Sequence, residues 1–227
     1  MLVALGSALA AEPGFDASGM TTVPLDADPR DPLFVERPGV MQAGDAFAGA
    51  MLGYARGALD TPDASLNDVG YLGLSLGAAL HPSLRVDLLA PIALATSDAG
   101  GWHGPAMGDI RLRTLISVLP PEAIEGGGGA GLGLVGFVDL PSGAVGRNLG
   151  WGEPSGGMKL AGTYEGRRFT LTADAGFAAR PTSVALPDEG GATVMAGVAA
   201  GVLATDDLGI TAEAGLRMPL DGTLGLD

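Results

Sequence analysis

The sequence predicts an all-β fold, arranged as an antiparallel up-and-down (meander) barrel. Three observations lead to this prediction. Apolar and polar residues alternate with a period of two in one segment after another, the links between these segments are alternately long and short, and the apolar content is spread over many short runs. A period of two places successive side chains on opposite faces of a strand, and alternating link lengths are typical of an up-and-down barrel.

The alternation is clearest between Val194 and Met218. The second half of this stretch, LGITAEAGLRM, has an apolar residue at every second position, and the first half, TVMAGVAAGVLA, is similar except at Met195 and Leu203. The tripeptide TDD lies between the halves, so the stretch predicts two strands joined by a tight turn. Alternating strands of about ten residues have the length that a tilted membrane-crossing strand needs. We therefore predict a transmembrane β-barrel.

Composition narrows the class of protein further. The chain of 227 residues is 47% hydrophobic with a mean hydropathy of +0.33, yet its apolar runs are far shorter than the roughly 18 residues of a spanning helix. Its 39 glycines disfavour long helices. The net charge of −14 argues against a nucleic-acid partner, which would need a basic face. Without cysteine there is neither a disulfide framework nor a thiolate metal site.

The first 39 residues differ from the rest. Residues 1–11, MLVALGSALAA, form a short apolar run with an A-x-A cleavage pattern, and we interpret them as the remnant of a secretory signal. A short buried strand or a helix end is the alternative. Residues 12–39 are rich in Pro, Asp and Gly and predict an extended lead-in, in which the aspartates at 26, 28 and 31 form a solvated turn rather than a Ca²⁺ loop. Residues 40–227 are assigned to the barrel.

The barrel region contains nine predicted strands. Long links and short ones follow each other in turn, and both tryptophans, Trp102 and Trp151, fall in long links near a predicted rim. The strands are residues 45–57, 68–80, 83–96, 108–119, 130–140, 156–165, 167–179, 192–205 and 208–218. The long links are 57–68, 97–107, 141–155 and 180–191, the tight ones 81–82, 165–167 and 206–207, and 120–129 is intermediate.

Most of these strands carry one or two charges on their otherwise small, polar face. An Arg or Lys that faces lipid at mid-depth costs about 2–4 kcal/mol, so these groups are expected to face a polar lumen. They could pair with each other and fill a narrow barrel, which is the expected arrangement, or line a channel. The predicted lumen-facing residues are Arg85, Asp87, Arg111, Arg113, Lys159, Asp174, Glu213 and Arg217.

Short motifs that could carry chemistry lack the context they need. The G-x-G-x-x-G match at 131–136 should open a helix in a dinucleotide site, but a strand continues through it. His81 and His103 have no clustered third ligand. Ser142 lacks a nucleophile elbow, and the acidic pair 188–189 predicts a solvated turn. We therefore predict no catalytic, metal or cofactor site.

Several segments together resemble a known family. YARGAL, RVDLLAPIAL, GDIRLRTLISVL, GFVDLPSG and the EGR hairpin ending in FAARP are similar to the N-terminal barrel of OmpA-type outer-membrane proteins, in the variety found in deltaproteobacteria such as myxobacteria, over residues 40–218. The resemblance implies a barrel without catalytic residues. In that family acidic calcium-binding repeats and a peptidoglycan-binding domain commonly follow, and neither is present in this sequence.

Three features depart from the family pattern. Nine strands are visible where bacterial single-chain barrels have an even number, no closing strand precedes Asp227, and aromatic residues make up only 5%. The first two features lead us to expect a fragment, truncated at its C-terminal end. Peptidoglycan would be a partner only of a missing C-terminal domain.

Three function classes follow from these patterns. The leading one is a bacterial outer-membrane barrel with a structural or passive-pore role and no turnover, whose partners are outer-membrane lipid and small solutes. The alternative is a soluble all-β binding module of lipocalin type, with Phe137, Tyr164 and Phe177 lining a cavity. A barrel enzyme is the third, although it needs converging Ser, His and Asp groups and the two histidines are predicted at opposite ends.

Overall fold

The computed structural model describes an all-β chain. It covers residues 35–38, 42–60, 65–98, 101–119, 128–144, 149–150, 152–180, 191–205 and 208–220. Within these ranges there is no helix long and apolar enough to cross a membrane. The strands are β1 (Ala46–Asp60), β2 (Ser65–His81), β3 (Leu84–Asp98), β4 (Gly101–His103), β5 (Ala106–Met107), β6 (Ile110–Leu119), β7 (Gly129–Leu140), β8 (Ser155–Glu165), β9 (Phe169–Arg180), β10 (Gly191–Leu203) and β11 (Gly209–Leu220).

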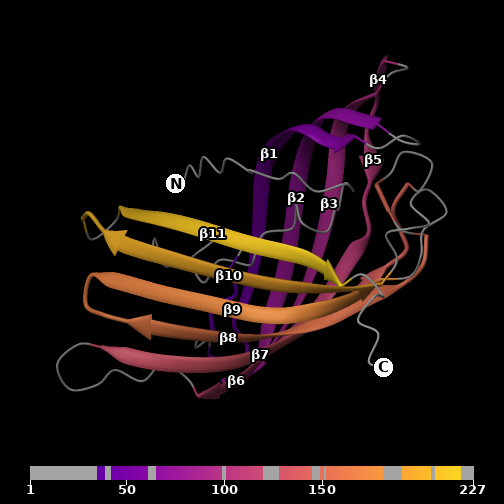
Figure 1. Cartoon of the computed structure of the whole chain (residues 1–227). Coiled ribbons are helices and arrows are strands. Elements are labelled where there is room, and N and C mark those ends of the chain that lie inside the picture. The colour runs from indigo at the N-terminus through magenta and orange to yellow at the C-terminus, as the bar shows by residue number, and fades with distance from the viewer. Residues whose placement is uncertain are drawn as a thin grey trace, which may run out of the picture.

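All the strands belong to one antiparallel sheet, which curls into an open half-barrel (Figure 1). Its order is β1-β2-β3-β6-β7-β8-β9-β10-β11, so each long strand pairs with its neighbours in sequence. β4 and β5 lie off this path and pair only with β3. β1 and β11 are the two edges of the sheet, each with one hydrogen-bonded neighbour among the described strands. The up-and-down fold class predicted from the alternation is confirmed.

The nine predicted strands all form, but two links differ from the prediction. Residues 57–68 do not form a long loop, because β1 and β2 continue to pair as far as Asp60 and Ser65 after a register shift beyond Arg56. This leaves only 61–64 between the strands. Backbone groups that pair across the ladder satisfy each other, and Pro62 in the remaining link could not have donated to it.

The predicted loop at 97–107 is also mostly strand. β4 folds back on β3, with His103 opposite Thr96, and β5 continues along the same strand with Met107 opposite Ile92. β6 then takes over the pairing with β3 after the Gly108 amide donates to the carbonyl of Pro91 at 2.8 Å. β4, β5 and β6 therefore act as one interrupted partner of β3, and β4 extends this corner of the sheet (Figure 1).

The two faces of the sheet have opposite character. Apolar side chains of nearly every long strand are exposed on the outer, convex face. The alternate positions on the buried, inner face hold polar and charged side chains together with some apolar ones, such as Leu89, Leu115 and Val135. On β6, for example, Ile116 and Val118 are exposed, whereas Arg113 and Ser117 are buried. Met195, an exception to the polar alternation, packs inside against Phe137 and Ala178. The alternation predicted for the strands is thus present, with ionic groups on the inner face.

Glycines on the inner face make room for large neighbours. A β-carbon at Gly77 would meet the ring of Phe47 from β1 and the carboxylate of Asp87 from β3. Gly77 lies directly opposite both residues in the sheet register. Gly53 in the same way accommodates the ring of Tyr71. The small residues of the inner face therefore determine where large and charged side chains fit.

We expect the substitution Gly77→Ala to lower the free energy of unfolding by about 1–3 kcal/mol, because the added methyl group overpacks Phe47 against Asp87. Gly136→Ala in β7 is the matched control, since no atom lies within 4 Å of its β-carbon position. The control should change stability by no more than about 0.5 kcal/mol. Urea titration monitored by circular dichroism measures both, and equal effects would contradict this packing.

Candidate functional site

The inner face carries charged side chains that the sheet register brings together. Asp87 on β3 lies directly opposite Arg113 on β6, and Arg111 on β6 lies opposite Asp139 on β7. Because directly opposed residues on one face have β-carbons about 5 Å apart, each register pair becomes an ion pair. The distances are 2.9 Å from Arg113 Nε to Asp87 Oδ2 and 2.7 Å from Arg111 Nε to Asp139 Oδ1.

Asp87 is the centre of the first cluster. It contacts Arg113 from the neighbouring strand and Arg85 from its own strand, where Arg85 Nε lies 3.3 Å from Asp87 Oδ1. Residues two apart on a strand share a face, which explains the second contact. All three side chains are at most 4% exposed. Charges withdrawn from water this completely are stable only with charged partners, so the cluster behaves as one unit.

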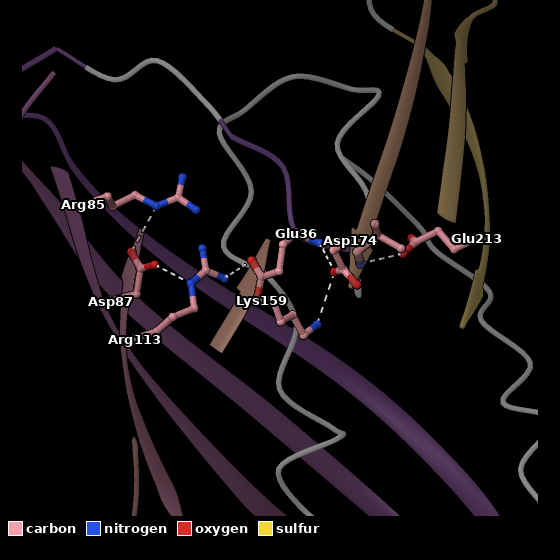
Figure 2. A network of polar contacts seen from close by, with 8 residues as sticks. Glu36, Arg85, Asp87, Arg113, Lys159, Asp174 and Glu213 are labelled. Atoms are coloured by element: carbon pink, nitrogen blue, oxygen red, sulfur yellow. Dashed lines mark hydrogen bonds and ion pairs between the residues drawn. The ribbon is translucent and has the colours of Figure 1, made fainter. Parts of the chain in front are cut away.

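The cluster continues through a short segment that lies inside the half-barrel. Arg113 Nη1 lies 2.9 Å from Glu36 Oε2, and the Glu36 amide donates a hydrogen bond of 2.7 Å to Asp174 Oδ2 on β9. Lys159 Nζ on β8 lies 3.2 Å from the same Asp174 oxygen. The Val35 amide donates to Glu213 Oε2 on β11 at 3.2 Å. Figure 2 shows this chain of contacts from Arg85 to Glu213.

A second cluster lies on β6, β7 and β8. Arg111 makes two contacts with Asp139, of 2.7 and 3.0 Å, and its guanidinium lies 4.2 Å from the ring centroid of Phe137. The Ser155 hydroxyl donates to Asp139 at 2.9 Å. The two-pronged contact and the cation–π stacking hold Arg111 in one orientation.

The eight residues predicted to face a lumen therefore have different surroundings. Six belong to the chain of contacts through Val35 and Glu36: Arg85, Asp87, Arg113, Lys159, Asp174 and Glu213. Arg111 lies in the separate cluster with Asp139. Arg217 pairs through its backbone with Met195, but its side chain lies outside the described residues.

Four charged residues were not among those predicted. Glu36 and Arg37 lie on the inner segment, and Arg37 Nη2 is 2.7 Å from Glu165 Oε1 at the end of β8. Asp139 is the fourth, as the partner of Arg111. One signal in the sequence could have pointed to the three carboxylates among them. The predicted set holds five basic residues and only three acidic ones, and buried cations need carboxylate partners.

The short motifs without catalytic context lie in paired strands or make hydrogen bonds to the backbone. Residues 131–136 lie within β7, which continues to Leu140, as the sequence predicts. The Ser142 hydroxyl accepts a hydrogen bond from the Ile110 amide at 2.9 Å and lies 3.2 Å from the Gly108 carbonyl. His81 and His103 pair with opposite ends of β3. Among the described residues no group of three His, Asp or Glu side chains could hold a metal ion.

The aromatic residues correct one prediction. Phe137 is buried on the inner face, whereas Tyr164 and Phe177 are 44% and 48% exposed on the outer face. These three rings therefore do not line one cavity, because they lie on opposite sides of the sheet. Trp102 is exposed in β4. The predictions for Trp151, for the acidic pair 188–189, and for residues 1–11 and 12–34 lie outside the described residues.

Comparison with known proteins gave no relative. No protein-family model matches the chain, and no curated protein or solved structure matches it. The structure thus supports an antiparallel, barrel-like meander, and the resemblance to OmpA-type proteins stays a prediction.

We expect Arg113→Met to lower the free energy of unfolding by about 3–5 kcal/mol, because it leaves Asp87 and Glu36 without their shared cation in a buried site. The matched control is Arg167→Met in the exposed β8–β9 turn, which should change stability by less than about 0.5 kcal/mol. Urea titration measures both. A loss at Arg113 no larger than the control's would mean that the buried cluster does not stabilise the fold.

Proposed function

We propose that this chain is a bacterial outer-membrane β-barrel that acts through its shape, as a structural element or a passive pore, without turnover. The observation that carries the proposal is the reversed polarity of the sheet. Ion pairs are buried on its inner face, and large apolar side chains are exposed on its outer face. A barrel in a bilayer needs this arrangement, because lipid surrounds it and water or polar groups fill it.

The outer face argues for a lipid environment. Exposed apolar residues follow every long strand of the sheet, including Leu52 on β1, Leu160 on β8 and Ile210 on β11, which are 53–72% exposed. Soluble monomers rarely expose a contiguous apolar patch larger than a few hundred Å². A surface that is apolar across so many neighbouring strands is therefore expected to contact acyl chains.

The rings near the strand ends fit the same environment. Tyr164 and Phe169 lie where β8 and β9 meet, with ring centroids 5.6 Å apart. Trp102 on β4 pairs with Ser97 next to the end of β3, at the other rim of the sheet. Aromatic side chains are enriched where a barrel crosses the two membrane interfaces. The two rims thus carry candidate interface residues.

The proposal requires partners for both sheet edges. An unpaired backbone group in hydrocarbon costs several kcal/mol, so β1 and β11 must each gain a neighbour in a bilayer. The resemblance to OmpA-type barrels supports this proposal, since the quoted segments lie on the strands of the half-barrel. Small solutes would be partners only of an open interior.

The location can be tested by fractionating Gram-negative cells that express the chain behind a secretory signal. We expect it in the outer-membrane fraction, with a band that migrates faster in unboiled samples than in boiled ones because a folded barrel resists the detergent. A protein recovered only from the soluble fraction would overturn the proposal.

Contact of the outer face with lipid can be tested by making the same leucine-to-arginine substitution at two different depths in the bilayer. Leu160→Arg, in the middle of β8, should reduce the free energy of folding into phospholipid vesicles by about 2–4 kcal/mol. Leu140→Arg, at the last residue of β7, should cost only about 0–1 kcal/mol, because an arginine there can reach the interface. Equal, small effects at both positions would indicate a water-exposed face.

A further inference from the structure

We propose that the segment Val35–Pro38 is an internal plug that closes the barrel interior to small hydrophilic solutes. This inference rests on the proposed barrel function. The four residues lie on the inner face of the sheet, and all are buried. They belong to the stretch that the sequence predicted only as an extended lead-in.

Polar contacts attach the plug to four strands. The Glu36 carboxylate pairs with Arg113 on β6, while the Glu36 amide donates to Asp174 on β9. The Arg37 guanidinium contacts Glu165 on β8 through Nη2 at 2.7 Å and Nε at 3.3 Å. The Val35 amide donates to Glu213 on β11. Attachment at points spread around the curl holds the plug across the interior, and Figure 2 shows the contacts with Arg113, Asp174 and Glu213.

Two strands leave space for the plug. A β-carbon at Gly133 on β7 would lie 3.0 Å from Pro38 Cβ, and one at Gly197 on β10 would lie 3.1 Å from Val35 Cγ2. Both distances are shorter than ordinary van der Waals contact, so a larger residue at either position would press on the plug. The two glycines thus form a shallow seat on the inner face, complementary to Val35 and Pro38.

The number of strands in the sheet indicates why the barrel interior needs a plug. Eight strands enclose an interior that side chains alone can fill. The main path already has nine strands, so a barrel that contains them encloses more than an eight-stranded one, and residues 35–38 lie on its inner face. Displacing the plug would leave a narrow path lined by both Arg113 and Asp174, so solutes would be sorted by size more than by charge.

The charge-reversal pair Arg37 and Glu165 tests the plug, because neither residue belongs to the cluster around Asp87. Purified variants are folded into phospholipid vesicles, and permeability to a small neutral sugar is measured by vesicle swelling. Arg37→Glu and Glu165→Arg should each raise the rate of vesicle swelling about tenfold. Each variant replaces an attractive ion pair with a repulsion, and this change raises the population of the unseated plug by about the same factor. The double variant restores opposite charges and should return towards the unaltered chain.

Matched controls separate the plug from a general effect of charge. Arg167→Glu and Glu153→Arg make the same reversals at exposed positions and should leave swelling unchanged. Equal swelling for the unaltered chain, both single variants and the double variant would overturn the plug while leaving the barrel intact. Absence of a heat-shifted band in the vesicles would overturn the barrel, and the plug with it.

A disulfide gives a second measurement that does not depend on conduction. The chain has no native cysteine, so Val35→Cys with Gly197→Cys introduces the only two thiols. A β-carbon at position 197 would lie 3.1 Å from Val35 Cγ2, so a cysteine sulfur in the place of Cγ2 lies within reach of a disulfide with a cysteine at 197. We expect oxidation to consume both thiols in the folded barrel, and to suppress the swelling of Arg37→Glu until a reductant is added. Two thiols that stay free in folded protein under oxidant would overturn the seated plug.

Discussion

Each buried charge needs a partner of opposite charge, and the rest of this structure depends on that constraint. Asp87, Arg85 and Arg113 are almost fully withdrawn from water, and no one of them is stable there alone. The sheet register supplies the first pairing, because Asp87 and Arg113 face each other across β3 and β6. One aspartate and two arginines still leave an excess of positive charge, and Glu36 offsets it from the inner segment. The register and the seating of residues 35–38 are therefore linked through Arg113.

Because the two faces of the sheet have opposite polarity, only one register between neighbouring strands is favourable. A shift by one residue would turn every ionic side chain of a strand outward and every apolar side chain inward. On β9 such a shift would expose Asp174 and bury Leu171 and Phe177, and Asp174 would lose both Lys159 and the Glu36 amide. Glycine strengthens this specificity, because Gly77 admits Phe47 and Asp87 in only one register. Packing and charge pairing thus favour the same alignment.

The strands could be predicted from the sequence because their signal is local, whereas the inner segment could not. Alternation around Arg111 and Arg113 is visible within ten residues, and it places both on the polar face. The contact between Glu36 and Asp174 joins residues 138 positions apart, and nothing in the residues around Glu36 indicates it. The extent of pairing in β1, β2 and β4 was missed for another reason. Backbone hydrogen bonds continue a ladder beyond the end of clear alternation, since they do not depend on side-chain type.

The inner segment also bears on how far the sheet can open. β6 and β11 are five neighbours apart in the sheet order, yet the adjacent residues Val35 and Glu36 contact Glu213 on β11 and Arg113 on β6. Adjacent α-carbons are only about 3.8 Å apart, so two consecutive residues can reach both strands only if the sheet curls tightly between them. Flattening this part of the sheet would pull Glu213 away from the Val35 amide or Arg113 away from Glu36. The same contacts that compensate the buried charge therefore favour the curl of the sheet between β6 and β11.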